Sequence, residues 1–327
     1  MDLHKEAYKT LDRIRMDHQK TKEQRQAQVY RALPQIETLD QEISKLGLNL
    51  VTAALEEQEP DMLAAMLQGL RIRIDELRAD KQRLLTSQFP VDYLDLHHLC
   101  PLCLDTGQVH HKRCQCVEKL ITDKYLEISG IQALLQHENF DTFQLDYYSD
   151  TTMITPNLSE RRYMQTMLQH VQRFCHRFGQ EADNLLFFGD PGRGKTFLCN
   201  CITKALTDAG VGVFYSTATR LAKTITTNQF DKDPQTKKML DLYYTAPLLI
   251  LDDLGTEFST AVTNPELFAI INTRILDGKS TVISTNLDSK ALEEIYSQRV
   301  TSRLFGIYKP FKVVGTDIRL AKRRKNM

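Results

Sequence analysis

The chain has 327 residues, of which 42% are hydrophobic and 26% are charged, as is typical of a folded protein long enough for two domains. Because 42 Lys and Arg balance 42 Asp and Glu, no net charge draws the whole molecule toward nucleic acid or an anionic membrane. No apolar run approaches the roughly 18 residues that span a bilayer, and the start of the chain lacks the apolar core of a signal peptide. We therefore expect a cytoplasmic protein with no membrane partner.

Residues 1–90 are rich in Leu, Glu, Gln, Arg, Lys and Ala, a composition that predicts helices. Pro34 and Pro60 are expected to separate these helices. Between Asp61 and Leu85 the apolar residues recur mostly three, four or seven positions apart, so one face of that helix needs a partner. Two interpretations stay open and do not exclude each other, namely that the face closes a helical hairpin and that it docks on another protein.

Four of the seven cysteines fall close together, whereas a secreted disulfide framework would spread them along the chain. Zn2+ in a closed tetrahedral site is the expected occupant, because small modules of this kind gain their folding energy from the metal. The expected ligands are Cys100, Cys103, Cys114 and Cys116. A neighbouring histidine could replace one thiolate, and the candidates are His97, His98, His110 and His111.

From residue 161 onward, short apolar runs alternate with helical patterns, which predicts an α/β fold with a parallel sheet between helices. The polar stretch 141–156 has turn residues and little periodicity, so the main boundary is expected near it. The predicted strands lie at 185–188, 211–215, 248–251 and 281–284.

The turn after the first of these strands matches the P-loop pattern and precedes a helix, as that pattern requires. Its glycines let backbone N–H groups surround phosphate oxygens, and the helix N-terminus adds partial positive charge. Lys195 is expected to reach the β- and γ-phosphates of ATP, and Thr196 to ligate Mg2+. The residues expected to bind the nucleotide are Gly189, Asp190, Pro191, Gly192, Arg193, Gly194, Lys195 and Thr196.

Two carboxylates and an amide follow the next predicted strands. Asp252 is expected to hold the magnesium ion, directly or through water. Asp253 either orients or deprotonates the attacking water, which predicts hydrolysis, or only caps the following turn. Asn286 is expected to position the same water or to contact the γ-phosphate.

Two arginines complete the predicted site, because a planar and permanently charged guanidinium suits the charge that builds on transferring phosphoryl oxygens. They are Arg303 and Arg319, and Arg299 competes for the role of Arg303. The alternative is that each is a solvated or ion-paired surface arginine.

Taken in order, the segments GDPGRGKT, LLILDDLG, TVISTNL, VTSRLFG and GTDIR resemble the DnaC/DnaI/IstB branch of the AAA+ ATPases, over roughly residues 160–320. The resemblance implies catalytic roles for Asp253, for Asn286 as first sensor and for Arg319 as second sensor. It implies that Arg303 is an arginine finger acting on the ATP of the adjacent subunit. Self-assembly into a ring or spiral with ATP would follow.

The zinc-bearing N-terminal region is what DnaI-like loaders have, so the resemblance implies a loader of the hexameric replicative DNA helicase. Such a protein places the helicase on single-stranded DNA during replication initiation, and ATP hydrolysis drives release. Turnover of ATP to ADP and phosphate is expected to be weak and stimulated by the partner or by DNA. The alternatives are an IstB-like helper of DNA transposition and a nucleotide-switched adaptor with little turnover.

Because the net charge of the chain is zero, binding of single-stranded DNA would require local clusters of basic and aromatic side chains. A solvated surface is the alternative interpretation of such charges. The candidates are Tyr215, Arg220, Lys223, Lys237, Lys238, Lys322, Arg323, Arg324 and Lys325.

The expected architecture is a C-terminal AAA+ P-loop ATPase domain, with a parallel sheet between helices, preceded by helices and a small zinc-binding domain. The expected parts are a helical region at 1–90, a zinc-binding module with a helix at 91–140, a linker at 141–160 and the ATPase domain at 161–327.

Overall fold

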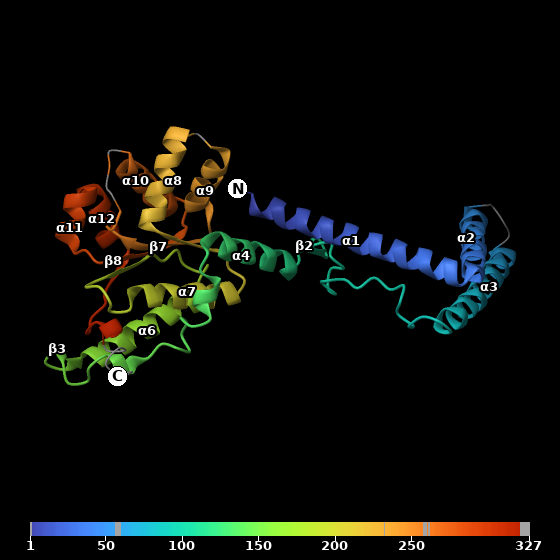
Figure 1. Cartoon of the computed structure of the whole chain (residues 1–327), viewed down its shortest axis with the longest axis horizontal. Helices are drawn as coiled ribbons and strands as arrows, with labels where there is room; N and C mark the ends of the chain where they lie inside the picture. The colour runs from blue at the N-terminus through green and yellow to red at the C-terminus, as the bar shows by residue number, and fades with distance from the viewer. Residues whose placement is uncertain (1, 56–59, 232, 258–259, 261, 321–327) are drawn as a thin grey trace. The chain divides into compact units, whose positions relative to one another are not determined.

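The computed structural model describes residues 2–55, 60–231, 233–257, 260 and 262–320 (Figure 1). The chain forms two compact units, one comprising Tyr8–Lys112 and the other Met1–Ala7 with Arg113–Met327. We call them the N-terminal unit and the nucleotide unit, and describe each by itself. The four-part division expected from the sequence stays a prediction.

The N-terminal unit is built mainly from long helices, as its composition predicts. They are α1 (Leu3–Ala32), which belongs to this unit from Tyr8 onward, α2 (Pro34–Leu55) and α3 (Pro60–Thr86). Pro34 and Pro60 each begin a helix, where the missing N–H of proline costs no hydrogen bond. Helices α2 and α3 pack against each other, so the apolar face of α3 at least partly closes a hairpin.

The nucleotide unit contains a five-stranded parallel sheet in the order β6-β7-β8-β5-β9. The central strands are short apolar runs buried on both faces, the pattern of a parallel sheet covered by helices. The strands are β5 (Leu185–Phe188), β6 (Val213–Thr217), β7 (Leu248–Leu254), β8 (Ser280–Thr285) and β9 (Lys309–Lys312).

Helices cover both faces of this sheet. In Figure 1, α6 (Glu160–His176) and α7 (Lys195–Asp208) lie below it, and α8 (Ala218–Asp231), α9 (Pro234–Thr245) and α10 (Thr263–Leu276) lie above it. The α/β fold class expected from the sequence is therefore confirmed, together with the helices that precede it. The remaining helices of the unit are α4 (Gln115–Ser129), α5 (Gln132–Leu135), α11 (Ser289–Tyr296) and α12 (Gln298–Gly306).

The segment expected to be a linker packs onto the nucleotide unit. It contains a short 3-10 helix, η1 (Leu145–Tyr147), and a hairpin of β3 (Met153–Thr155) and β4 (Leu158–Ser159). Tyr148 is only 1% exposed and joins the core formed by α6, α7 and the sheet. No helix within the described part of the chain is long and apolar enough to cross a membrane.

A fully buried arginine holds one side of the sheet. Arg274, on α10, donates from Nε to the Thr281 hydroxyl at 2.9 Å and from Nη2 to the Ser280 carbonyl at 2.6 Å. Its Nη1 donates to the Ala246 carbonyl at 2.9 Å and also reaches the carbonyls of Tyr243 and Tyr244. Burial lowers the pKa of Arg274 to about 10. Its dense set of hydrogen-bond acceptors offsets the free-energy cost of burying the charged guanidinium.

Replacement of Arg274 tests whether its hydrogen bonds stabilise this side of the sheet. We expect Arg274→Leu to lower the free energy of unfolding by about 3 kcal/mol or more, because several buried acceptors lose their donor at once. Denaturant unfolding followed by circular dichroism measures the change. The matched control is Arg177→Leu, which removes only an exposed ion pair with Glu181 and should cost less than about 1 kcal/mol. Equal losses for the two variants would contradict this account.

Candidate functional site

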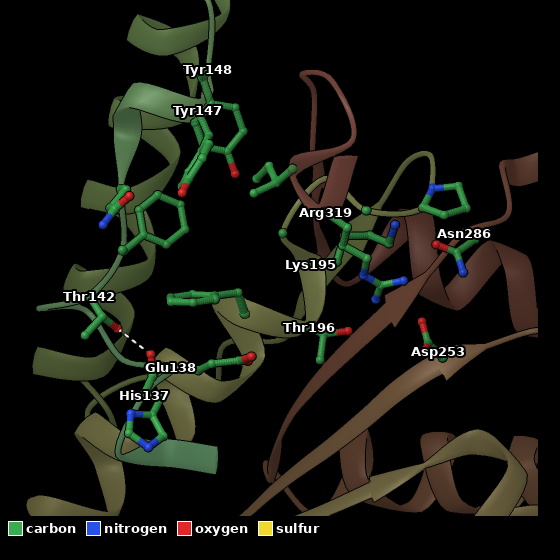
Figure 2. A pocket seen from close by; sticks show the side chains of 17 residues that line it. His137, Glu138, Thr142, Tyr147, Tyr148, Lys195, Thr196, Asp253, Asn286 and Arg319 are labelled. Atoms are coloured by element: carbon green, nitrogen blue, oxygen red, sulfur yellow. Dashed lines mark hydrogen bonds between the residues drawn. The ribbon is translucent and has the colours of Figure 1, made fainter. Parts of the chain in front are cut away.

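The predicted site residues converge where the parallel strands end. The P-loop follows β5, the acidic pair lies in the last part of β7, and Asn286 follows β8. A pocket lies at this edge of the sheet, and Figure 2 shows Lys195, Thr196, Asp253, Asn286 and Arg319 around it. The structure therefore brings together residues separated by more than a hundred positions in the sequence.

Close packing explains two glycines of the loop. Gly192 and Gly194 have φ angles of 76° and 101°, a backbone region that favours glycine. A Cβ at Gly192 would lie 2.4 Å from the Asp317 carboxyl group, and one at Gly194 would lie 2.8 Å from the Tyr148 hydroxyl. Helix α7 begins directly after Gly194, so its N-terminal N–H groups face the pocket edge and suit a phosphate.

Lys195 lies on this loop and is buried. Its Nζ donates to the carbonyl oxygens of Gly189 at 2.7 Å and Asp190 at 2.8 Å. Burial lowers the pKa of Lys195, while Asp253, Asp252 and Asp190 counteract that effect. Bound phosphate oxygens would supply further compensating negative charge, as expected for the lysine of a P-loop.

Asp252 is a buried carboxylate held by hydroxyl groups from three elements. It accepts from the Tyr215 hydroxyl at 2.6 Å, from the Ser284 hydroxyl, and from the Thr196 hydroxyl at 3.3 Å. The Thr196 hydroxyl and the Asp252 carboxylate are hard oxygen ligands of the kind Mg2+ prefers. Their contact fits the expected magnesium site, with Thr196 from α7 and Asp252 from β7.

Asp253 adopts a conformation that a non-glycine residue rarely takes, with a φ of 57°. Its N–H donates to the Ser284 hydroxyl at 2.9 Å, and its side chain lines the pocket (Figure 2). Burial and the neighbouring Asp252 raise the pKa of Asp253, whereas Lys195 and Arg319 lower it. A strained residue with a raised pKa in a pocket fits a group that accepts a proton.

The two predicted arginines lie in different places. Arg319 lines the pocket with Asp253, whereas Arg303 is not among its lining residues. On α12, Arg303 donates from Nε to the Asn272 side chain at 3.0 Å and stacks 4.5 Å from the Phe268 ring centre. This placement away from the chain's own pocket is compatible with a finger for an adjacent subunit, and that role stays a prediction.

One wall of the pocket comes from residues that the sequence analysis did not select. His137, Glu138, Thr142, Tyr147 and Tyr148 face the P-loop across the pocket (Figure 2). Tyr148 also supports the loop directly, because its hydroxyl donates to the Arg193 carbonyl at 2.9 Å. The aromatic residues gathered between 140 and 148 were the sequence signal that could have revealed this wall.

The four predicted zinc ligands also converge. The sulfur atoms of Cys100, Cys103, Cys114 and Cys116 all lie within 4.8 Å of one another. The Gly107 N–H donates to the Cys103 sulfur at 3.3 Å, a contact that favours a thiolate. A set of four sulfurs suits tetrahedral Zn2+.

The histidine alternatives do not join this set in the described residues, where the group consists of cysteines alone. His98 instead contacts the Asp105 carboxylate, with Nδ1 at 3.3 Å from Oδ2. Zinc binding by the four cysteines stays a prediction.

Two of the expected DNA contacts are wrong. Tyr215 is 5% exposed and its hydroxyl serves Asp252, so it offers no face for stacking a base. Arg220 donates to the Ile128 carbonyl at 2.7 Å and to that of Ser129, so it satisfies the end of α4.

The other DNA candidates remain predictions. Lys223 on α8 and both Lys237 and Lys238 on α9 are exposed. The basic run at 322–325 lies outside the described residues.

Comparison with known proteins agrees with this site. Residues 161–303 match the family described as IstB-like ATP binding protein. The replicative helicase loader DnaC of Buchnera aphidicola subsp. Baizongia pistaciae is 22% identical over 177 residues, covering 54% of this chain and 66% of that relative. The loader DnaI of Bacillus subtilis is 23% identical over 168 residues, covering 47% of this chain and 53% of DnaI.

Among solved structures, one described as the DnaC helicase loader has a TM-score of 0.47 and 23% sequence identity, covering 55% of this chain and 99% of that one. The resemblance to the DnaC/DnaI/IstB branch is confirmed by the family match and the sequence relatives.

The hydrogen bond from Tyr148 to the P-loop can be tested by measuring ATP binding. We expect Tyr148→Phe to weaken ATP binding about fivefold, because loss of one hydrogen bond of about 1 kcal/mol loosens the loop. Calorimetric titration with a non-hydrolysable ATP analogue measures the dissociation constant. Tyr163→Phe is the matched control, since the Tyr163 hydroxyl bonds the backbone of Lys312 away from the pocket. If both variants bind like the wild type, Tyr148 does not support the loop.

Proposed function

We propose that this chain, whose residues 161–303 form an IstB-like ATP-binding domain, is an ATP-dependent loader of a hexameric replicative DNA helicase. The observation that carries the proposal is the convergence of the P-loop, the acidic pair, Asn286 and Arg319 on one pocket. The names of the sequence relatives, replicative helicase loaders DnaC and DnaI, support the choice of partner.

The pocket supports ATP hydrolysis as the chemistry. The P-loop N–H groups and Lys195 hold the phosphates, and Thr196 with Asp252 would hold Mg2+, which neutralises phosphate charge when bound. Asp253 accepts a proton from the attacking water while the water oxygen bonds to the γ-phosphorus. The bond from that phosphorus to the β–γ bridging oxygen breaks, so ADP leaves with the electron pair and phosphate is released.

Asn286 and Arg319 surround the same reacting group. Asn286 offers an amide to the attacking water or to a γ-phosphate oxygen, and Arg319 offers a guanidinium to the developing negative charge. Arg303, which contacts Asn272 and the Phe268 ring and does not line the chain's own pocket, would act on the ATP of an adjacent subunit. ATP would thereby join copies of the chain in a ring or spiral.

In this proposal ATP binding orders an assembly that holds the helicase and single-stranded DNA, and hydrolysis releases them. Zn2+ on the four cysteines would fold the module at residues 100–116. Turnover is expected to be slow until the helicase or DNA is bound.

Substitution of Asp253 tests the hydrolytic step. We expect Asp253→Asn to lower turnover at least about 100-fold while ATP still binds, because an amide cannot accept the proton. Steady-state phosphate release and equilibrium nucleotide binding separate these two effects. Asp183→Asn is the control, because it removes only a surface ion pair with Lys309.

The pH dependence of ATP turnover provides a second test of whether Asp253 accepts the proton. Since burial and Asp252 raise the pKa of Asp253, its proton-accepting form appears at higher pH than for an ordinary aspartate. Wild-type turnover should rise with pH through that displaced range, and the residual turnover of Asp253→Asn should not. A variant with wild-type turnover would remove Asp253 from the mechanism and favour the adaptor with little turnover.

The loader assignment is tested with the full-length chain and the hexameric replicative helicase of its host. We expect one complex in gel filtration with light scattering when ATP is present, and faster assembly of the helicase on circular single-stranded DNA. Lys195→Ala is the control, since it should lose the ATP dependence of both results.

Failure of both results would rule out the loader assignment. Recruitment of a transposase to duplex DNA would then be the leading alternative.

A further inference from the structure

Three side chains meet in the N-terminal unit, apart from the four cysteine sulfurs. His18 comes from the middle of α1, and His98 and Asp105 come from the cysteine module 80 residues further along the chain. One ligand atom of each lies within 4.8 Å of the other two. His98 was a candidate ligand for the cysteine set, but no spacing in the sequence connects it with His18 or Asp105.

Asp105 is the fixed member of the group. Its side chain is fully buried, and its two oxygens accept the N–H groups of Leu99 at 3.0 Å and Cys100 at 2.8 Å. Carboxylates that ligate metals are held in this way by further hydrogen bonds, which fix the direction of the remaining lone pairs. Both imidazoles face the same oxygen, Oδ2 of Asp105.

The distances favour a shared ion over direct ion pairs. Nδ1 lies 3.3 Å from Oδ2 in His98 and 3.5 Å in His18, whereas charge-assisted N–H···O bonds usually measure about 2.7–2.9 Å. Two ligands bonded to Zn2+ at about 2.0–2.1 Å and at the tetrahedral angle lie about 3.3–3.4 Å apart. The two separations from Oδ2 of Asp105 are therefore close to two edges of a tetrahedron around a metal ion.

An unsatisfied atom points to the same conclusion. Nδ1 of His18 is shielded from solvent and makes no hydrogen bond, although such buried polar atoms normally have a partner. A metal bond would satisfy it. The His18 and His98 side chains are 31% and 26% exposed, so the group lies near the protein surface, and a water molecule is the expected fourth ligand.

We propose that His18, His98 and Asp105 bind a second divalent metal ion, separate from any ion on the four cysteines. Two imidazoles and one carboxylate suit Zn2+ among the common first-row ions. The ion attaches α1 to the segment at residues 98–105, so its binding energy stabilises the N-terminal unit. This inference does not depend on ATP hydrolysis or on the helicase.

Metal counting on the purified full-length chain tests the proposal. We expect two Zn2+ per chain by mass spectrometry of the metal, and one Zn2+ in both His18→Ala and His98→Ala. Alanine preserves the helix at position 18. The controls are His4→Ala on the same helix and His97→Ala next to His98, both at exposed positions, and each should keep two ions.

Cobalt substitution identifies the site that is lost. We expect the thiolate charge-transfer absorption of the four-cysteine set to persist in His18→Ala and His98→Ala, while one Co2+ per chain is lost. Fewer than two ions in the wild type would overturn the proposal, as would two ions in His18→Ala. Loss of the thiolate absorption with the histidine would also overturn it, since His18 would then only support the cysteine set.

Discussion

The nucleotide unit depends on one buried carboxylate and the three hydroxyl groups that hold it. Hydroxyls from the P-loop helix, from β6 and from β8 hold the negative charge of Asp252, in addition to its electrostatic interaction with the buried Lys195. Each donor belongs to a different element, and the carboxylate fixes the spacing between them. The residues that we expect to bind Mg2+ thus also constrain the spacing of these elements around the sheet.

Ser284 links this constraint to the neighbouring acid. It donates its proton to Asp252 and accepts the N–H of Asp253, so one hydroxyl serves both carboxyl groups. The second contact occurs where the Asp253 backbone has its positive φ, a conformation that costs about 1–3 kcal/mol and persists only where the surroundings enforce it. Ser284 therefore helps to hold Asp253 in the strained conformation in which its side chain lines the pocket.

Local patterns predicted what depends on local chemistry. The P-loop, the acidic pair and Asn286 were predicted because each follows a predicted apolar strand, whereas Arg319 was predicted from the segment GTDIR and its guanidinium charge. The contacts of Tyr215, Arg220 and Tyr148 were not predicted, because each joins segments that lie at least 37 positions apart. An aromatic or basic residue has the same sequence signature whether it meets DNA or a buried carboxylate.

The same long-range contacts extend the nucleotide pocket beyond the residues of the family match. Tyr148 and Arg319 line the pocket but lie outside residues 161–303. On the other side of Asp252, the Tyr215 N–H donates to the Ser129 hydroxyl at 3.0 Å. The Arg220 guanidinium donates to the carbonyls of Ile128 and Ser129, the last residues of α4.

Helix α4 is thereby attached to β6 at its C-terminal end, and its N-cap is Cys114. The Asp252 carboxylate is therefore connected to a cysteine of the predicted zinc set through Tyr215, Ser129 and the length of α4.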